Sequence, residues 1–81
     1  MQTTMGKQRG PLAQFVVRER YRRGFTQEDL ASEAGISVTS LVNLETGKRN
    51  PSPKTLYRIA TALGVDGGTL FDLMEQGQED E

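Results

Sequence analysis

Apolar residues recur along this chain at the three- and four-residue spacing of α-helices, in short segments separated by glycine, proline and small polar residues. The first predicted helix begins at Pro11, a residue type favoured at the first helical position, and ends at Arg23, before Gly24. The last two predicted helices follow at 53–63 and at about 68–76. We find no strand signal, so the pattern predicts an all-α domain of five short helices around one core.

The two middle helices are predicted to be joined by a tight turn. Thr26 precedes Asp29 by three residues, which predicts reciprocal capping, and Gly35 is suited to end that helix. Ser37 then caps the next helix. The buried positions of the pair are Leu30, Ala31, Ala34, Ile36, Leu41 and Leu44, and the outward positions are Gln27, Val38, Thr39 and Asn43. This layout is typical of a helix-turn-helix that reads DNA.

Composition restricts the chemistry open to the chain. Its 81 residues suffice for one small domain, and it contains neither cysteine nor histidine, which removes disulfides, thiolate ligands and the commonest metal ligand and general base. No apolar run approaches the ~20 residues that span a bilayer, and no signal-peptide stretch begins the chain. We expect a cytoplasmic, nucleoid-associated protein that is not an enzyme and uses no cofactor or metal.

The net charge of −1 hides an uneven distribution. Residues 1–58 hold all ten Lys and Arg with five acidic residues, a net charge of +5, whereas residues 59–81 hold six acidic residues and no base. The positive part of such a chain can meet phosphate while the negative part points elsewhere. We expect a flexible arm at 1–10, the helix-turn-helix domain at 11–76 and an acidic flexible tail at 77–81, which in a simpler interpretation only aids solubility.

A series of short segments is shared with a known family: Gly24-Phe25-Thr26-Gln27, Leu30-Ala31, Gly35-Ile36-Ser37, Leu41, Leu44-Glu45, Gly47-Lys48-Arg49, Pro51-Ser52, Leu56 and Ile59-Ala60-Thr61-Ala62-Leu63. With these residues at this spacing, the chain resembles the Cro/C1-type (XRE, lambda repressor-like) helix-turn-helix proteins, which include phage repressors and restriction-modification controller proteins. The resemblance covers roughly Leu12 to Met74. It implies a five-helix lambda repressor-like domain that binds operator DNA, usually as a homodimer. Because the chain ends soon after the fifth helix, we expect no separate effector domain.

The third predicted helix is the candidate recognition helix, since residues in its first turn and one turn later can face base edges in the major groove. Helical spacing and the resemblance select the same base-contacting residues: Ser37, Val38, Thr39 and Asn43. Asn43 suits the exposed edge of adenine, and Val38 and the Thr39 methyl suit a thymine methyl group. No Lys or Arg lies on this exposed side, so we expect DNA shape to supply part of the specificity.

Phosphate contacts are expected on both sides of that helix. The amino end of the second helix presents free N–H groups, and the loop after the third helix carries two cations. The expected phosphate-contacting residues are Thr26, Gln27, Ser40, Lys48, Arg49 and Asn50. The resemblance also places Arg20 against Glu45, as a structural pair that fixes the angle between helices rather than a DNA contact.

The fifth predicted helix is unusually apolar for its length. Four of its residues exceed what one narrow core stripe requires: Leu70, Phe71, Leu73 and Met74. They are candidates for a dimer interface, because a core of this size gains from a further buried surface. The alternative is that all four close the core of the single chain.

The leading prediction is a sequence-specific transcriptional regulator that binds a palindromic operator as a homodimer. A second interpretation is an antitoxin of a toxin–antitoxin pair, which binds DNA and also holds a protein partner through the fifth helix and the acidic tail. A third is a protein-interaction module that has the fold without binding DNA. Steep salt dependence of DNA binding favours the first two, and copurification of a second polypeptide favours the antitoxin.

Overall fold

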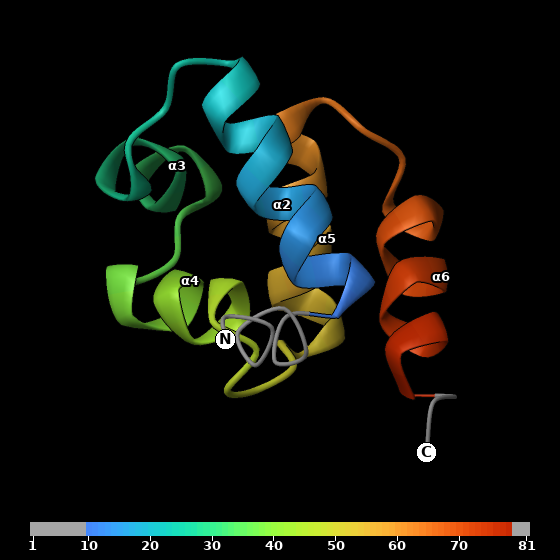
Figure 1. Cartoon of the computed structure of the whole chain (residues 1–81). Coiled ribbons are helices and arrows are strands. Elements are labelled where there is room, and N and C mark those ends of the chain that lie inside the picture. The colour runs from blue at the N-terminus through green and yellow to red at the C-terminus, as the bar shows by residue number, and fades with distance from the viewer. Residues whose placement is uncertain (1–9, 79–81) are drawn as a thin grey trace.

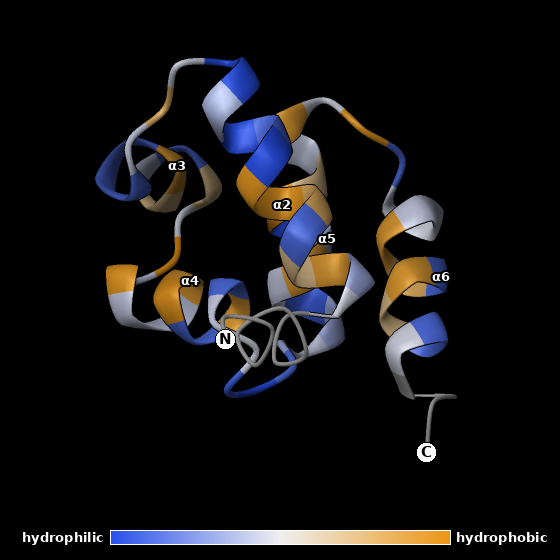
Figure 2. Ribbon diagram, in the orientation of Figure 1, coloured by the Kyte–Doolittle hydropathy of each residue, from blue (hydrophilic) through white to orange (hydrophobic). Residues whose placement is uncertain are grey.

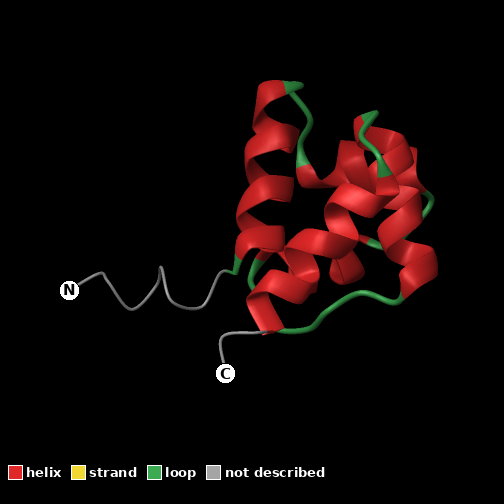
Figure 3. Cartoon of the chain, turned by 90° about the vertical axis from the view of Figure 1, so that its right-hand side faces the viewer, coloured by secondary structure: helices red, strands yellow, loops and turns green. Residues whose placement is uncertain are grey.

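The structure, a computed structural model, describes residues 10–78. In this part of the chain there are five helices and no strand, so the predicted all-α, five-helix fold is confirmed. The helices are α2 (Pro11–Arg22), α3 (Gln27–Ala34), α4 (Val38–Glu45), α5 (Pro53–Leu63) and α6 (Gly67–Gln78). α3 packs on α4 and α5, α2 packs on α4 and α6, and α6 also packs on α5 (Figure 1). Short loops join them, as the turned view in Figure 3 shows.

One core joins all five helices. Each helix contributes at least one fully buried large side chain, and these are Val16, Leu30, Leu41, Leu56, Ile59, Leu63 and Leu70. Figure 2 shows the apolar side of α6 turned toward the other helices. Full burial of a side chain of this size stabilises the fold by about 1.5–3 kcal/mol. The core therefore fixes how α3 and α4 are presented to the surroundings.

The ends of the middle helices follow from local capping. Thr26 and Asp29 form the reciprocal capping box at the start of α3. Ser37 accepts a hydrogen bond from the backbone of Ser40 and so caps α4. Gly35 ends α3 in the left-handed conformation, with φ of 71°, which residues with a side chain rarely adopt. Only three residues separate α3 from α4, so the turn between them is short.

The bounds of two helices differ from the sequence prediction. α2 ends at Arg22 rather than Arg23. α6 runs from Gly67 and continues through Gly77 and Gln78, which the sequence pattern assigns to the tail. Gly77 packs against the start of α2, since a Cβ on it would lie 3.3 Å from Cδ of Pro11, and this contact favours the extra helical residues.

Most of the predicted arm and tail lies outside the part of the chain that the structure describes. Gly10 is the N-cap of α2, and residues 1–9 and 79–81 lie outside the described residues. Within residues 10–78, no helix has the length and apolar character needed to cross a membrane.

Candidate nucleic-acid interface

The first turn of α4 presents its side chains to solvent. Ser37, Val38, Thr39 and Ser40 are all exposed, and Val38 keeps 39% of its surface accessible although it is apolar. Val38 therefore does not serve the core. An exposed apolar side chain beside small hydroxyls on a helix amino end is suited to contact base edges and methyl groups in a major groove.

The two serines of this turn have different hydrogen bonding. Oγ of Ser37 accepts the backbone N–H of Ser40 at 3.0 Å, and the Ser37 hydroxyl donates to Oγ of Ser40 at 3.0 Å. Ser37 is thus held by the cap. Ser40 retains its own hydroxyl proton, which is available to donate to a phosphate oxygen.

Asn43 lies one turn further along α4 and is half-buried. Its backbone carbonyl accepts the N–H groups of Lys48, at 2.9 Å, and Arg49, at 3.3 Å. These bonds hold the loop after α4 against the end of the helix. Both loop cations are exposed, and among the described residues neither forms an ion pair with a carboxylate. Their charge is therefore free to meet an external anion.

A hollow of about 240 Å³ lies between α4, this loop and the start of α5. It is lined by Ser40, Asn43, Arg49, Asn50, Pro51, Ser52 and Thr55. Four of the predicted DNA-contacting residues thus surround one concave surface. Sequence reasoning does not place Pro51, Ser52 or Thr55 there, because the Ser52 capping signal locates the start of α5 along the chain but not the face it shares with α4.

Arg20 of α2 and Glu45 at the end of α4 form a buried, two-pronged ion pair. Nε of Arg20 donates to Oε2 of Glu45 at 2.7 Å, and Nη2 donates to Oε1 at 3.1 Å. Nη1 of Arg20 also donates to the carbonyl of Phe25 at 2.9 Å. The hydrogen bonds that Arg20 donates to the Glu45 carboxylate raise the pKa of Arg20 above its ordinary value, so its guanidinium keeps its positive charge. The arrangement joins α2, α4 and the loop before α3.

Gln27, the first residue of α3, is attached to the same carboxylate. Its Nε2 donates to Oε1 of Glu45 at 3.0 Å. An amide nitrogen has two hydrogens, so one remains to donate outward. Sequence reasoning assigns Gln27 to phosphate and Glu45 to architecture and misses the bond between them, which no local pattern signals across 18 residues.

The amino end of α3 is less positive than the helix dipole alone implies. Thr26 is exposed and its side chain caps the helix by accepting the N–H of Asp29 at 3.0 Å. Glu28 and Asp29 are both acidic and lie in the first turn. Two carboxylates offset the partial positive charge of the free N–H groups. A phosphate contact at this end therefore depends on the Gln27 amide.

The four α6 residues predicted for a dimer interface do not have equal access. Leu70 is fully buried in the protomer core, which corrects its assignment, because its side chain cannot reach a second copy. Phe71, Leu73 and Met74 are half-buried and pack against that core. A partly covered apolar strip thus remains on α6.

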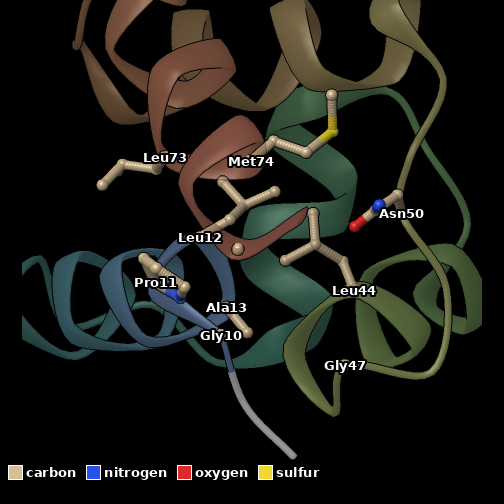
Figure 4. Close-up of a pocket in the computed structure, with 10 residues that line it drawn as sticks. Gly10, Pro11, Leu12, Ala13, Leu44, Gly47, Asn50, Leu73 and Met74 are labelled. Atoms are coloured by element: carbon tan, nitrogen blue, oxygen red, sulfur yellow. The ribbon is translucent and has the colours of Figure 1, made fainter. Parts of the chain in front are cut away.

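Next to this strip is a pocket of about 150 Å³ between α2, α4 and α6. Figure 4 shows Leu12, Leu44 and Met74 around it, with Gly47 and Asn50 of the loop at one side. This pocket is therefore lined both by residues of α6 and by residues of the loop after α4, the loop that is expected to contact phosphate.

The sequence of this chain is similar to that of known proteins. The family described as "Helix-turn-helix" matches residues 17–70. The chain is 48% identical over 48 residues to the uncharacterized HTH-type transcriptional regulator y4dJ of Sinorhizobium fredii. That alignment covers 59% of this chain and 62% of the relative, so the chain spans less than two thirds of that protein's length.

Solved structures share the same arrangement of helices. The N-terminal DNA-binding domain of SinR from Bacillus subtilis superimposes with a TM-score of 0.70 at 28% identity, covering 74% of this chain and 88% of that one. SinR in complex with DNA gives 0.69 at 28% identity, with 74% and 97% covered. A mutant of the restriction-modification controller protein C.Esp1396I gives 0.70 at 27% identity, with 85% and 89% covered.

Proposed function

Because the chain belongs to the helix-turn-helix family of DNA-binding transcriptional regulators, we propose that it binds a palindromic operator as a homodimer and inserts α4 into the major groove. Regulation follows from occupancy of the operator, which blocks or recruits polymerase and requires no chemistry. Operator DNA lies in the nucleoid, within the cytoplasm, and we propose the same location for the protein.

One observation carries the base-reading part of the proposal: Val38 and Thr39 are exposed on the first turn of α4, and Asn43 follows one turn later at the edge of a hollow. Asn43 can donate to and accept from adenine together, and the two β-branched side chains suit thymine methyl groups. Ser37 borders the same surface, but its hydroxyl already serves the helix cap. Asn43 is therefore the main source of hydrogen-bonded specificity.

The backbone-contacting part rests on charge and hydrogen-bond donors that flank α4. Lys48 and Arg49 supply positive charge that no carboxylate of residues 10–78 pairs, while Asn50 and the Ser40 hydroxyl supply neutral donors. At the amino end of α3, Gln27 can donate its second amide hydrogen to a phosphate. Thr26 precedes it and is exposed, so it is also accessible to the DNA backbone. Each ionic phosphate contact adds about one unit to the salt dependence of binding.

The homodimer is supported by the half-buried apolar strip of Phe71, Leu73 and Met74 on α6. A two-fold symmetric dimer presents two copies of α4, so half-sites are expected about 34 Å apart, one turn of DNA, or at a multiple of that distance. The acidic residues of α6, Asp72 and Glu75, are exposed and oppose a DNA contact on that side.

Selection of bound sites from random duplex DNA, at two salt concentrations, tests the proposal. The expected result is an inverted repeat whose spacing reports the dimer, with affinity that falls steeply as salt rises. A selected single half-site would contradict the homodimer and leave DNA reading intact. Failure to enrich any sequence, with no salt-dependent binding to bulk DNA, would leave the interaction module as the better interpretation.

A further inference from the structure

The turn between α3 and α4 is held from outside by a side chain of α5. Gly35, the left-handed residue that ends α3, directs its carbonyl toward α5, where Nη1 of Arg58 donates to it at 3.0 Å. A Cβ on Gly35 would lie 3.7 Å from the same nitrogen, an ordinary van der Waals contact, so the guanidinium lies directly beside this residue. Carbonyls at a helix end have lost their partners within the helix, so this bond supplies one that the helix itself lacks.

The charge of Arg58 matches this position. α3 has two acidic residues, Glu28 and Asp29, in its first turn and no basic residue in its last turn. The carboxyl end of a helix carries partial negative charge, which a cation stabilises. Among the described residues Arg58 forms no ion pair with a carboxylate, so its guanidinium is directed to the end of α3.

The position of the bond matters because of how α4 is supported. α4 packs mainly on α2 and α3, whereas α5 packs on α3. α5 therefore supports α4 through α3 and the short turn. Gly35 precedes the α4 N-cap Ser37 by two residues, and Val38 and Thr39 follow at once. Fixing the Gly35 peptide limits the directions in which the first turn of α4 can leave.

We propose that Arg58 is a positioning residue for sequence reading: by holding the Gly35 carbonyl, it fixes the first turn of α4 against the bases without touching DNA itself. The inference rests on the proposed function, in which Val38 and Thr39 contact bases. It predicts that losing Arg58 weakens binding to the operator but not to DNA of unrelated sequence. A phosphate contact predicts the opposite, an equal loss for all sequences.

The test compares Arg58→Met with Lys48→Met, a variant of the proposed phosphate contact. Dissociation constants are measured for the selected operator and for unrelated DNA at several salt concentrations. Arg58→Met is expected to lose about threefold to tenfold in operator affinity per half-site, the range of one exposed, charge-assisted hydrogen bond, with an unchanged salt slope. Lys48→Met is expected to weaken both DNAs alike and to lower the slope by about one.

Arg58→Lys keeps the charge and a donor, and it is expected to recover part of the lost operator affinity. A thermal unfolding curve for each variant shows whether it is folded at the assay temperature. If Arg58→Met is not folded, the operator affinity and salt slope of Arg58→Lys are compared with those of the wild type instead. Unchanged operator affinity in folded Arg58→Met, or a salt slope lowered by about one, overturns the inference. If the wild-type protein shows no sequence preference, the proposed function fails instead, so the two failures are distinguishable.

Discussion

The side chain of Gln27 donates from Nε2 to Oε1 of Glu45 over 3.0 Å, and so joins the amino end of α3 to the carboxyl end of α4. Glu45 is almost completely buried and is also paired with Arg20. One carboxylate thus orients a residue of the proposed DNA surface and holds three segments together. The architecture and the binding surface are linked at this point.

Removal of Arg20 is expected to be strongly destabilising. Arg20→Met leaves the carboxylate of Glu45 buried without its counter-charge, which lowers the free energy of unfolding by about 3–5 kcal/mol. The double variant Arg20→Met with Glu45→Met removes both charges and is expected to regain most of that loss. Urea unfolding followed by circular dichroism measures both. A loss below about 1 kcal/mol for the single variant would show that the pair does not hold the helices.

The capping box of α3 is expected to give the protein a pH-dependent contribution to stability. Hydrogen bonding by the backbone of Thr26 lowers the pKa of Asp29 below its ordinary value of 3.8. The carboxylate is favoured by folding, so its contribution is complete above pH 3.8 and is lost as the pH falls through the lowered pKa. The stability difference between wild type and Asp29→Asn should therefore be constant from about pH 5 to 7 and shrink below pH 3.8.

Thr26→Ala provides the comparison for that experiment. It removes a hydroxyl that does not titrate, and loss of such a cap lowers the free energy of unfolding by about 0.5–2 kcal/mol. If the difference in free energy of unfolding between wild type and Asp29→Asn were the same at about pH 3 as at neutral pH, the proposed titration of Asp29 would be incorrect.

Local patterns are sufficient for most of the helix ends. Thr26, Ser37 and Ser52 cap the helices that they are predicted to cap, because a side-chain oxygen reaches N–H groups only three residues away. Gly35 and Gly64 end helices for a similarly local reason, the left-handed conformation that follows a last helical turn.

Relations across the chain are not accessible in this way. The pattern identifies α6 as apolar but does not show that Leu70 alone of its four candidates is completely buried. The end of α6 is misplaced by the sequence prediction because the contact of Gly77 with Pro11 joins opposite ends of the domain. The bonds of Gln27 to Glu45 and of Arg58 to Gly35 depend on the packing of whole helices, which no local spacing encodes.

Two leucines of α6 separate dimerisation from folding. Leu73 is half-buried, and Leu73→Glu places a charge on the proposed interface, so sedimentation velocity should show a shift from dimer to monomer with the helical content retained. Leu70→Ala should instead lower the free energy of unfolding by about 2–5 kcal/mol, because it leaves a cavity in the core. A Leu73→Glu variant that remains dimeric would place the interface on another surface.

Base reading and backbone contact are separable at Asn43 and Lys48. Asn43→Ala removes the only amide side chain on the described residues of α4 and is expected to weaken binding to the preferred operator by about 1–3 kcal/mol per half-site. The preference should relax at one base position in each half-site, because a single side chain contacts one base pair. The salt slope should stay unchanged, since no charge is removed, whereas Lys48→Met should lower it by about one.

Binding-site selection with each variant measures the base preference at every position, and titrations at several salt concentrations measure the slope. If Asn43→Ala instead weakened all sequences equally, its amide would be contacting backbone in the hollow that it shares with Arg49 and Asn50, and the specificity would rest on Val38, Thr39 and the shape of the DNA.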